Sequence, residues 1–109
     1  MKTLRLTAPA RATLQEIIKY TIEVFGVQQA ERYQQQLIAT AERLCNSQFP
    51  LGRDCSLLLD EDSGTSKLLY VREGMHYLIY TETSEHIVLH DFIHVNRNLP
   101  ALLNAIKRR

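Results

Sequence analysis

The sequence predicts an α+β fold, in which two helices precede an antiparallel sheet instead of alternating with its strands. Residues 8–45 contain two stretches with apolar residues at helical spacing. Residues 66–95 contain three segments with the alternation and β-branched content typical of strands. Helices segregated from antiparallel strands define this class, because each kind of element then packs as a layer against the other. We expect one twisted sheet with a helical hairpin on one face.

The first half of the chain predicts a strand and a helical hairpin. Residues 2–6 alternate between apolar and polar side chains, as in a short strand. Thr7 is a candidate N-cap, and Pro9 lies in the first turn of the helix, where its missing donor costs little. This helix should end at Gly26, and a second should run from Gln28 to Cys45. The short connection between them predicts an antiparallel hairpin.

The second half predicts a three-stranded antiparallel meander and a short C-terminal helix. The strands expected are Ser66–Val71, Met75–Thr81 and His86–Val95, with a tight turn around Glu73–Gly74. The helix is expected over Leu99–Ile106.

The segment that joins the two halves has mixed character. We expect a loop over Asn46–Arg53, a brief extended stretch at Leu57–Leu59 and an acidic loop at Asp60–Asp62.

Length and composition limit the classes of protein. The 109 residues correspond to one domain, 1–109, and 13 Lys+Arg against 12 Asp+Glu leave a net charge of +1. This balance argues against direct nucleic-acid binding through bulk electrostatics. No apolar run approaches the ~18 residues of a membrane span, and the first residues lack the apolar core of a secretion signal. We therefore expect a cytoplasmic protein without membrane contact.

Cysteine and histidine content gives no sign of a metal or cofactor. Cys45 and Cys55 are too few for a disulfide framework or a zinc site. His86, His90 and His94 share a face of the expected last strand as even-numbered residues. Four strand residues span about 13 Å, so neighbouring members of this set cannot ligate one ion. We expect no metal and no cofactor.

Several short pieces of the chain together carry a family resemblance. The chain resembles the ParE branch of the RelE/ParE toxins of bacterial type II toxin–antitoxin modules, over about residues 4 to 103. The pieces, in order, are Leu6–Ala10, Leu14–Tyr20, Phe25–Tyr33, Pro50–Arg53, Met75–Tyr80, Ile93–Asn98 and Pro100–Leu103. Family members often have His-x-Arg-x-Asp where this chain has His94, Asn96 and Asn98.

The resemblance implies a RelE/ParE-like fold and a growth-arresting toxin held silent by a cognate ParD-like antitoxin, in a module for plasmid stabilisation. ParE toxins inhibit DNA gyrase, whereas RelE toxins cleave messenger RNA on the ribosome. Fold alone does not decide between these activities. Asn96 and Asn98 leave open a third reading, a degenerate toxin that acts only as an antitoxin-binding corepressor.

The residues favour gyrase inhibition over RNA cleavage. Phosphodiester cleavage needs a general base, a general acid and positive charge around the phosphate. Between residues 66 and 95 the only Lys or Arg residues are Lys67 and Arg72, and no tyrosine follows Tyr80. We expect a toxin that is not an enzyme. The candidate target-binding residues are Arg72, Tyr77, His94, Arg97, Lys107, Arg108 and Arg109.

A separate set of residues is expected to bind the antitoxin. Ile38 and Cys45 lie off the main apolar stripe of the second helix, as expected of a groove for an amphipathic antitoxin helix. Arg53, the last residue of the Pro50–Arg53 piece of the resemblance, is the third antitoxin-binding candidate.

Overall fold

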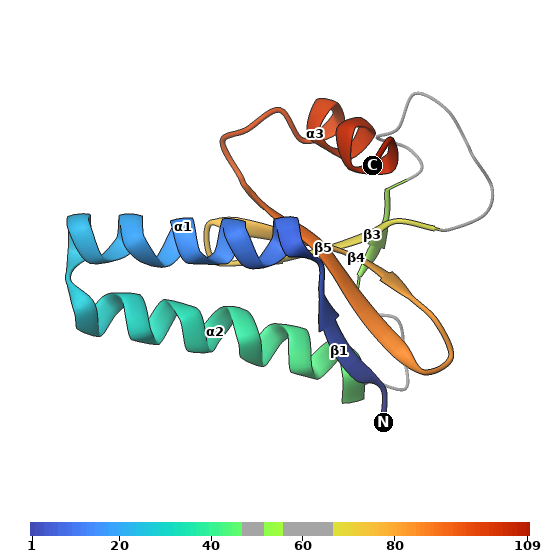
Figure 1. Ribbon diagram of the computed structural model, residues 1–109, viewed down its shortest axis with the longest axis horizontal. Helices are drawn as coiled ribbons and strands as arrows, with labels where there is room; N and C mark the ends of the chain where they lie inside the picture. The colour runs from blue at the N-terminus through green and yellow to red at the C-terminus, as the bar shows by residue number, and fades with distance from the viewer. Residues whose placement is uncertain (47–51, 56–66) are drawn as a thin grey trace.

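A computed structural model describes residues 1–46, 52–55 and 67–109. It confirms the α+β class, with a helical hairpin packed on a mixed sheet (Figure 1). The elements in chain order are β1 (Thr3–Leu6), α1 (Ala8–Phe25), α2 (Val27–Asn46), β2 (Arg53–Asp54), β3 (Leu69–Glu73), β4 (His76–Glu82), β5 (His86–His94) and α3 (Leu99–Lys107). The expected segments Leu57–Leu59 and Asp60–Asp62, and the start of the strand expected at Ser66, lie outside the described residues.

The sheet has five strands in the order β1-β5-β4-β3-β2. β1 runs parallel to β5, with Thr3 opposite His86 and Leu6 opposite Leu89, and the other pairs are antiparallel. The meander of β3, β4 and β5 is therefore confirmed, and β1 extends it. β2 was not expected: Arg53 was placed at the end of a loop, but it pairs with Tyr70 of β3.

Local capping signals set the ends of the helical hairpin. The Thr7 side chain accepts a hydrogen bond from the Ala10 N–H, as predicted for an N-cap. Gly26 has φ of +93°, a conformation that a side chain disfavours, and it alone separates the two helices. α2 therefore begins at Val27, one residue before the expected start.

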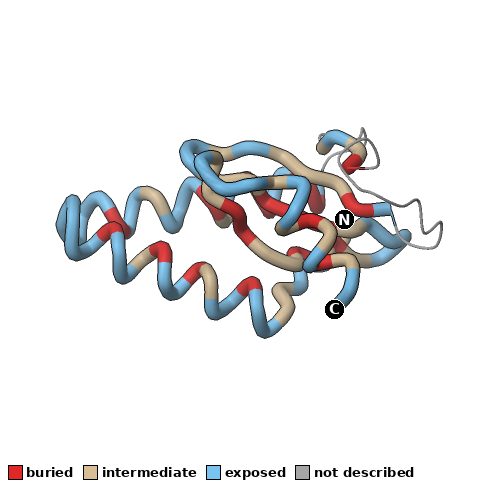
Figure 2. The backbone as a smooth tube through the Cα atoms, turned by 90° about the horizontal axis from the view of Figure 1, so that it is seen from above, coloured by how far each residue is buried: buried red, intermediate tan, exposed pale blue. Residues whose placement is uncertain are grey.

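Two apolar clusters cover the two faces of the sheet. The larger one lies under the hairpin and includes Leu37 and Leu89. The smaller one lies under α3 and includes Ile93 and Leu103. Figure 2 shows exposed residues gathering at the outer end of the hairpin, away from the sheet. Cys45 belongs to the first cluster and Cys55 to the second, and both are free thiols.

A β-bulge interrupts the pairing of β4 with β5. Ile79 lies opposite Asp91, but the next residue, Tyr80, lies opposite Leu89. His90 is therefore the extra residue of the bulge, with no residue opposite it.

The bulge reverses which residues of β5 face the hairpin. Leu89 and Phe92 both pack into the cluster under the hairpin, although three positions separate them. The expectation that His86, His90 and His94 share a face is therefore wrong, because one extra residue shifts the alternation by one.

Candidate functional site

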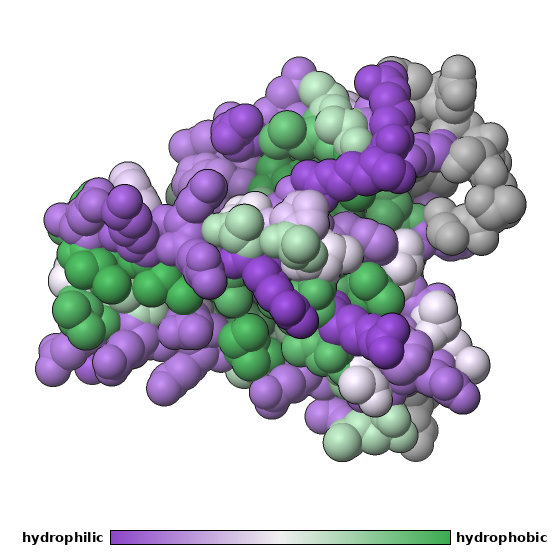
Figure 3. Space-filling view, in the orientation of Figure 1, coloured by the Kyte–Doolittle hydropathy of each residue, from purple (hydrophilic) through white to green (hydrophobic). Residues whose placement is uncertain are grey.

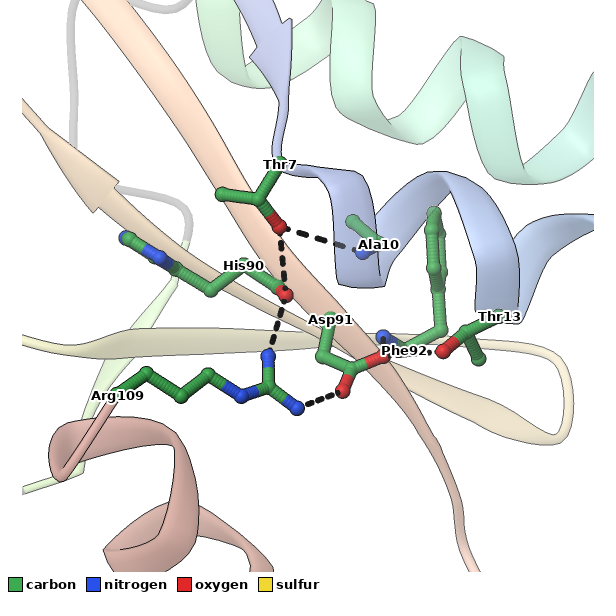
Figure 4. A network of polar contacts seen from close by, with 7 residues as sticks. All are labelled: Thr7, Ala10, Thr13, His90, Asp91, Phe92 and Arg109. Carbon is green, nitrogen blue, oxygen red and sulfur yellow. Dashed lines mark hydrogen bonds and ion pairs between the residues drawn. The ribbon is translucent and has the colours of Figure 1, made fainter.

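A polar network holds the bulge in place between α1 and α3 (Figure 4). The Thr7 hydroxyl and the Arg109 guanidinium both donate to the His90 carbonyl, each at 3.0 Å. The neighbouring Asp91 carboxylate accepts from the Thr13 hydroxyl at 2.6 Å and from Arg109 at 2.7 Å. Arg109, a predicted target-binding residue, therefore has two structural partners on β5.

A groove of about 770 Å³ lies where the hairpin extends past the end of the sheet. α1 has 18 residues, or about 27 Å of helix, and its last turns lie beyond the turn that joins β3 to β4. Two aromatic side chains in these turns are largely exposed, Tyr20 at 61% and Phe25 at 66%. Both line the groove, together with Ile17, Met75 and Phe92.

Apolar side chains also surround the outer end of the hairpin. Ile22, Val24, Phe25 and Val27 are all exposed there, and Figure 3 shows the resulting apolar surface. Contiguous exposed apolar surface of this kind marks interaction sites more often than scattered single residues do.

The polar end of the groove is built around Tyr33 of α2. Its hydroxyl accepts from the Met75 N–H at 3.1 Å and lies 2.6 Å from His76 Nδ1. The Glu73 carbonyl is 3.3 Å away. The Glu73 carboxylate in turn accepts from the Thr40 hydroxyl at 2.6 Å. α2 therefore holds the β3–β4 turn at two points, which fixes one wall of the groove.

Two imidazole rings stack edge to face beside Tyr33. The rings of His76 and His94 have centroids 5.1 Å apart and cross at 87°. Burial, and secondarily the neighbouring His94, lowers the pKa of His76 to about 4. Burial also raises the pKa of Tyr33. His94 Nδ1 accepts from the Asn96 N–H at 3.0 Å.

The rim of the groove on the side of β5 is basic. Arg97 is exposed and lines the groove. Arg72 lies at the turn, where its Nε donates to the Gly74 carbonyl at 2.9 Å. No acidic residue occurs from Phe92 to Arg109, whereas Glu16 lines the α1 side. The two walls of the groove therefore differ in charge.

The structure brings some of the predicted target-binding residues together. His94 and Arg97 line the groove, and Arg72 lies beside it. Tyr77 lies on the opposite face, where its ring packs edge to face with Tyr70 at 5.7 Å, next to the cluster under α3.

The basic residues at the chain end lie elsewhere. Lys107 ends α3, and Arg108 is its exposed C-cap. Arg109 follows and bonds β5 through its guanidinium.

The residues predicted to bind the antitoxin do not form an open groove. Cys45 is 8% exposed in the core, and Ile38 packs against the same cluster. The expectation of an off-stripe surface is wrong for Cys45, because α2 contacts α1 on one side and the sheet on the other and so buries a wide face. Ile38 is partly exposed, and its contact with the antitoxin stays a prediction. Arg53 is exposed on β2, at the opposite edge of the sheet from β1.

Sequence reasoning missed the residues that make the groove. Tyr20, Phe25 and Tyr33 are in neither candidate set, and only His94 and Arg97 of the groove lining were predicted to have a function. Length gave no signal, because 18 helical residues and the nine residues of β5 both extend over about 27–30 Å.

The two departures from the His-x-Arg-x-Asp pattern, Asn96 and Asn98, both have local structural roles. The Asn98 side chain caps α3 by accepting from the Ala101 N–H at 3.2 Å, a role that asparagine and aspartate fill equally well. Asn96 donates a hydrogen bond to His94 Nδ1 through its backbone N–H, which any residue except proline could provide. Neither departure disturbs the fold.

The described residues contain no group of three or more metal-ligating side chains close enough to hold an ion. They also contain no helix of the length and apolarity needed to cross a bilayer.

Comparison with known proteins identifies the family. Residues 4–99 match the family described as ParE toxin of the type II toxin–antitoxin system, parDE. Among solved structures, one described as the chromosomal ParDE TA system from P. aeruginosa is similar at a TM-score of 0.65 and 17% sequence identity, covering 88% of this chain and 98% of that one. No curated protein gives a match. Because the family match spans most of the chain, this protein belongs to the ParE toxins of type II toxin–antitoxin systems.

Proposed function

We propose that this ParE toxin arrests growth by inhibiting DNA gyrase in the cytoplasm, in a module for plasmid stabilisation, and that a ParD-like antitoxin neutralises it by occupying the groove. The observation that supports this antitoxin site is the groove itself. Its apolar walls, Tyr20 and Phe25 among them, meet a basic rim at Arg97. This combination suits an amphipathic protein segment with apolar anchors and a carboxylate.

The charge distribution favours a protein target over RNA. Of the two cations between residues 66 and 95, Lys67 lies 2.9 Å from the Asp54 carboxylate. Arg72 remains at the turn with one N–H on the Gly74 carbonyl. A surface that holds an RNA backbone needs several unneutralised cations. We therefore propose a binding toxin and not an enzyme, with Arg97 and the exposed Arg108 among its target contacts.

One observation favours a second candidate, ribosome-dependent RNA cleavage. A hydroxyl, two imidazoles and a guanidinium meet in the groove, at Tyr33, His76, His94 and Arg97. These are side-chain types that serve acid–base and phosphate chemistry. Against it, the Tyr33 hydroxyl and His76 Nδ1 bond each other, and a pKa near 4 makes His76 a weak base at neutral pH.

Induction in cells tests the proposal. The chain alone should stop growth, and co-production of the protein encoded beside it should restore growth. Plasmid supercoiling should fall in the arrested cells, while transcripts stay intact. Codon-phased cuts in messenger RNA within minutes of induction would support the nuclease instead. Normal growth with soluble, folded chain would support the corepressor.

Two neighbouring residues of α1 provide a matched test of the groove. Phe25 lines it, whereas Val24 lies only on the apolar surface at the outer end of the hairpin, and both are more than half exposed, so the pair separates the groove from that surface. F25S should weaken binding of the antitoxin at least tenfold, about 1.4 kcal/mol, whereas V24S should leave it within twofold. Equal effects of the two variants would exclude the groove as the antitoxin site.

A further inference from the structure

β5 continues beyond the strand that covers its outer edge. β1 pairs with β5 only as far as Leu6 opposite Leu89. β5 runs on to His94, while the chain leaves β1 at Thr7 and turns into α1 (Figure 4). Thr7 and Arg109 occupy the edge at His90, and the pairing of the sheet stops there. Among the described residues, the last residues of β5 therefore have β4 on one side and no strand on the other.

The register shows which backbone groups point to this free edge. The Val95 N–H donates to the Met75 carbonyl at 2.9 Å, directly beyond the pair His76–His94. In an antiparallel pair, hydrogen-bonded and non-hydrogen-bonded positions alternate. Ile93 therefore directs its backbone groups toward β4. Phe92 and His94 direct theirs to the free edge.

The free edge thus has four backbone groups, the N–H and the carbonyl of Phe92 and of His94, and two of them already have partners. The Phe92 N–H donates to the Asp91 carboxylate at 2.9 Å. The His94 carbonyl accepts from the Arg97 N–H at 2.9 Å. The Phe92 carbonyl and the His94 N–H remain, and neither has a partner among the residues that the structure describes. One acceptor and one donor thus lie two residues apart along the edge.

The groove opens onto this edge. Phe92, His94 and Arg97 line it on the side of the sheet, and Ile17 and Tyr20 line it on the side of α1. A chain that enters the groove beside β5 therefore meets the unpaired carbonyl and N–H directly.

We propose that the antitoxin segment in the groove binds in an extended conformation and adds a strand to β5 beyond the end of β1, through the Phe92 carbonyl and the His94 N–H. This inference rests on the proposed function, since it takes the antitoxin as the occupant. A helix has satisfied its own backbone groups and leaves the edge groups unpaired, whereas an extended segment satisfies them.

The walls define the side chains that the added strand carries. Successive side chains of a strand point to opposite faces. Those on the hairpin side meet Ile17 and Tyr20, so they are apolar. A carboxylate near the C-terminal end of β5 meets Arg97, on a rim that contains no acid from Phe92 onward. The segment is therefore short, extended and both apolar and acidic.

Amide hydrogen exchange at two neighbouring residues tests the inference. In the free toxin the His94 N–H should exchange quickly, while the Val95 N–H is held by Met75. In the saturated toxin–antitoxin complex, exchange at His94 should slow at least tenfold and exchange at Val95 should change little. Carbon chemical shifts of the antitoxin segment in contact with β5 should be those of a strand.

The outcomes separate the two proposals. A complex that forms with helical shifts in that segment, or with unchanged exchange at His94, would overturn strand addition and leave the antitoxin proposal standing. Failure of the antitoxin to bind the folded toxin would overturn both. A helix that covers the edge without bonding to it would slow His94 exchange but keep helical shifts, and this result also counts against strand addition.

Discussion

The guanidinium of Arg109 lies 2.7 Å from the carboxylate of Asp91, and this ion pair ties the segment after α3 to the bulge of β5. The Asp91 side chain is only 14% exposed and also accepts from Thr13 of α1 and the Phe92 N–H. One carboxylate thus joins α1, β5 and the C-terminal segment. A variant that replaces Lys107, Arg108 and Arg109 together would remove this ion pair as well as surface charge. Single variants are therefore needed to separate the effect of the ion pair from that of the charge.

We predict that D91N destabilises the protein by roughly 1–3 kcal/mol, because it weakens several charge-assisted hydrogen bonds at a mostly buried site. R109A should cost about 1 kcal/mol, since its side chain is 42% exposed and solvent screens the pair. R108A, one residue away and exposed, should change the free energy of unfolding by less than about 0.5 kcal/mol. Urea denaturation of the three variants measures this, and equal stability of R109A and R108A would show that the tie is unimportant.

The β3–β4 turn gives a second prediction, through a comparison of two glycines. Gly74 has φ of +58°, and a Cβ there would meet the Tyr33 ring at 2.7 Å. Gly26 also has positive φ, +93°, but a Cβ there would meet nothing within 4 Å. Both G74A and G26A incur backbone strain of roughly 1–2 kcal/mol. Only G74A should also displace Tyr33 and weaken antitoxin binding, as titration calorimetry would show. If folded G74A binds the antitoxin as tightly as the original chain, the conformation of the β3–β4 turn does not affect antitoxin binding in the groove.

Local signals explain why the helices were predictable from the sequence. Thr7, Gly26 and Asn98 are caps whose function depends on residues within one turn, so the observed helix ends fall within one or two residues of those expected. β2 was missed because its two residues form a strand only by pairing with β3.

Long-range contacts explain what the sequence did not reveal. The bulge at His90 is held by Thr7, 83 residues away, and by Arg109, 19 residues away. The groove depends on how α1 packs beside the end of β5 and the β3–β4 turn, and on Tyr33 reaching that turn about 40 residues later. His94 was identified because it lies in a family motif, and Arg97 because it is a cation in the acid-free stretch from Phe92 to Arg109, whereas Tyr33 lies among the apolar residues of α2 at helical spacing.

Stability should depend on pH through His76. The pKa of this ring is about 4 in the folded chain, against an ordinary value of 6.5, because burial disfavours the charged form. Between these values the unfolded chain binds more protons, so stability is full above about pH 6.5 and is lost as pH falls toward 4. The full shift corresponds to about 3 kcal/mol, and screening of a partly exposed ring reduces this to roughly 1–2 kcal/mol.

Thermal melts from pH 7.5 to 4.5 measure this dependence. H76N should flatten it, while a smaller dependence of the same sign should remain from His90, whose pKa is also lowered by burial and by Arg109. A H76N curve parallel to that of the original chain would exclude His76 as the source.

α3 should contribute to stability through packing. Leu103 is fully buried against the sheet, whereas Leu102 is partly exposed. L103A should therefore cost roughly 2–4 kcal/mol through lost transfer energy and a residual cavity, and L102A clearly less. Similar losses in denaturation midpoint for the two variants would mean that α3 does not dock as a fixed helix on this face.

The last prediction concerns charge at the rim of the groove. Arg97 lines the groove and Arg108 lies outside its lining, and both are exposed arginines in the acid-free stretch from Phe92 to Arg109. A rim charge acts mainly on the rate of encounter with a partner of opposite charge, and this effect is screened by salt because the Debye length falls from about 14 Å at 0.05 M to about 5 Å at 0.4 M. R97S should therefore slow association with the antitoxin about three- to tenfold at low salt, and the difference should shrink at high salt, while R108S associates at the original rate. Stopped-flow association at both ionic strengths measures this. If R97S and R108S slow association equally, the basic C-terminal surface as a whole steers the partner, and the rim has no special part in recognition.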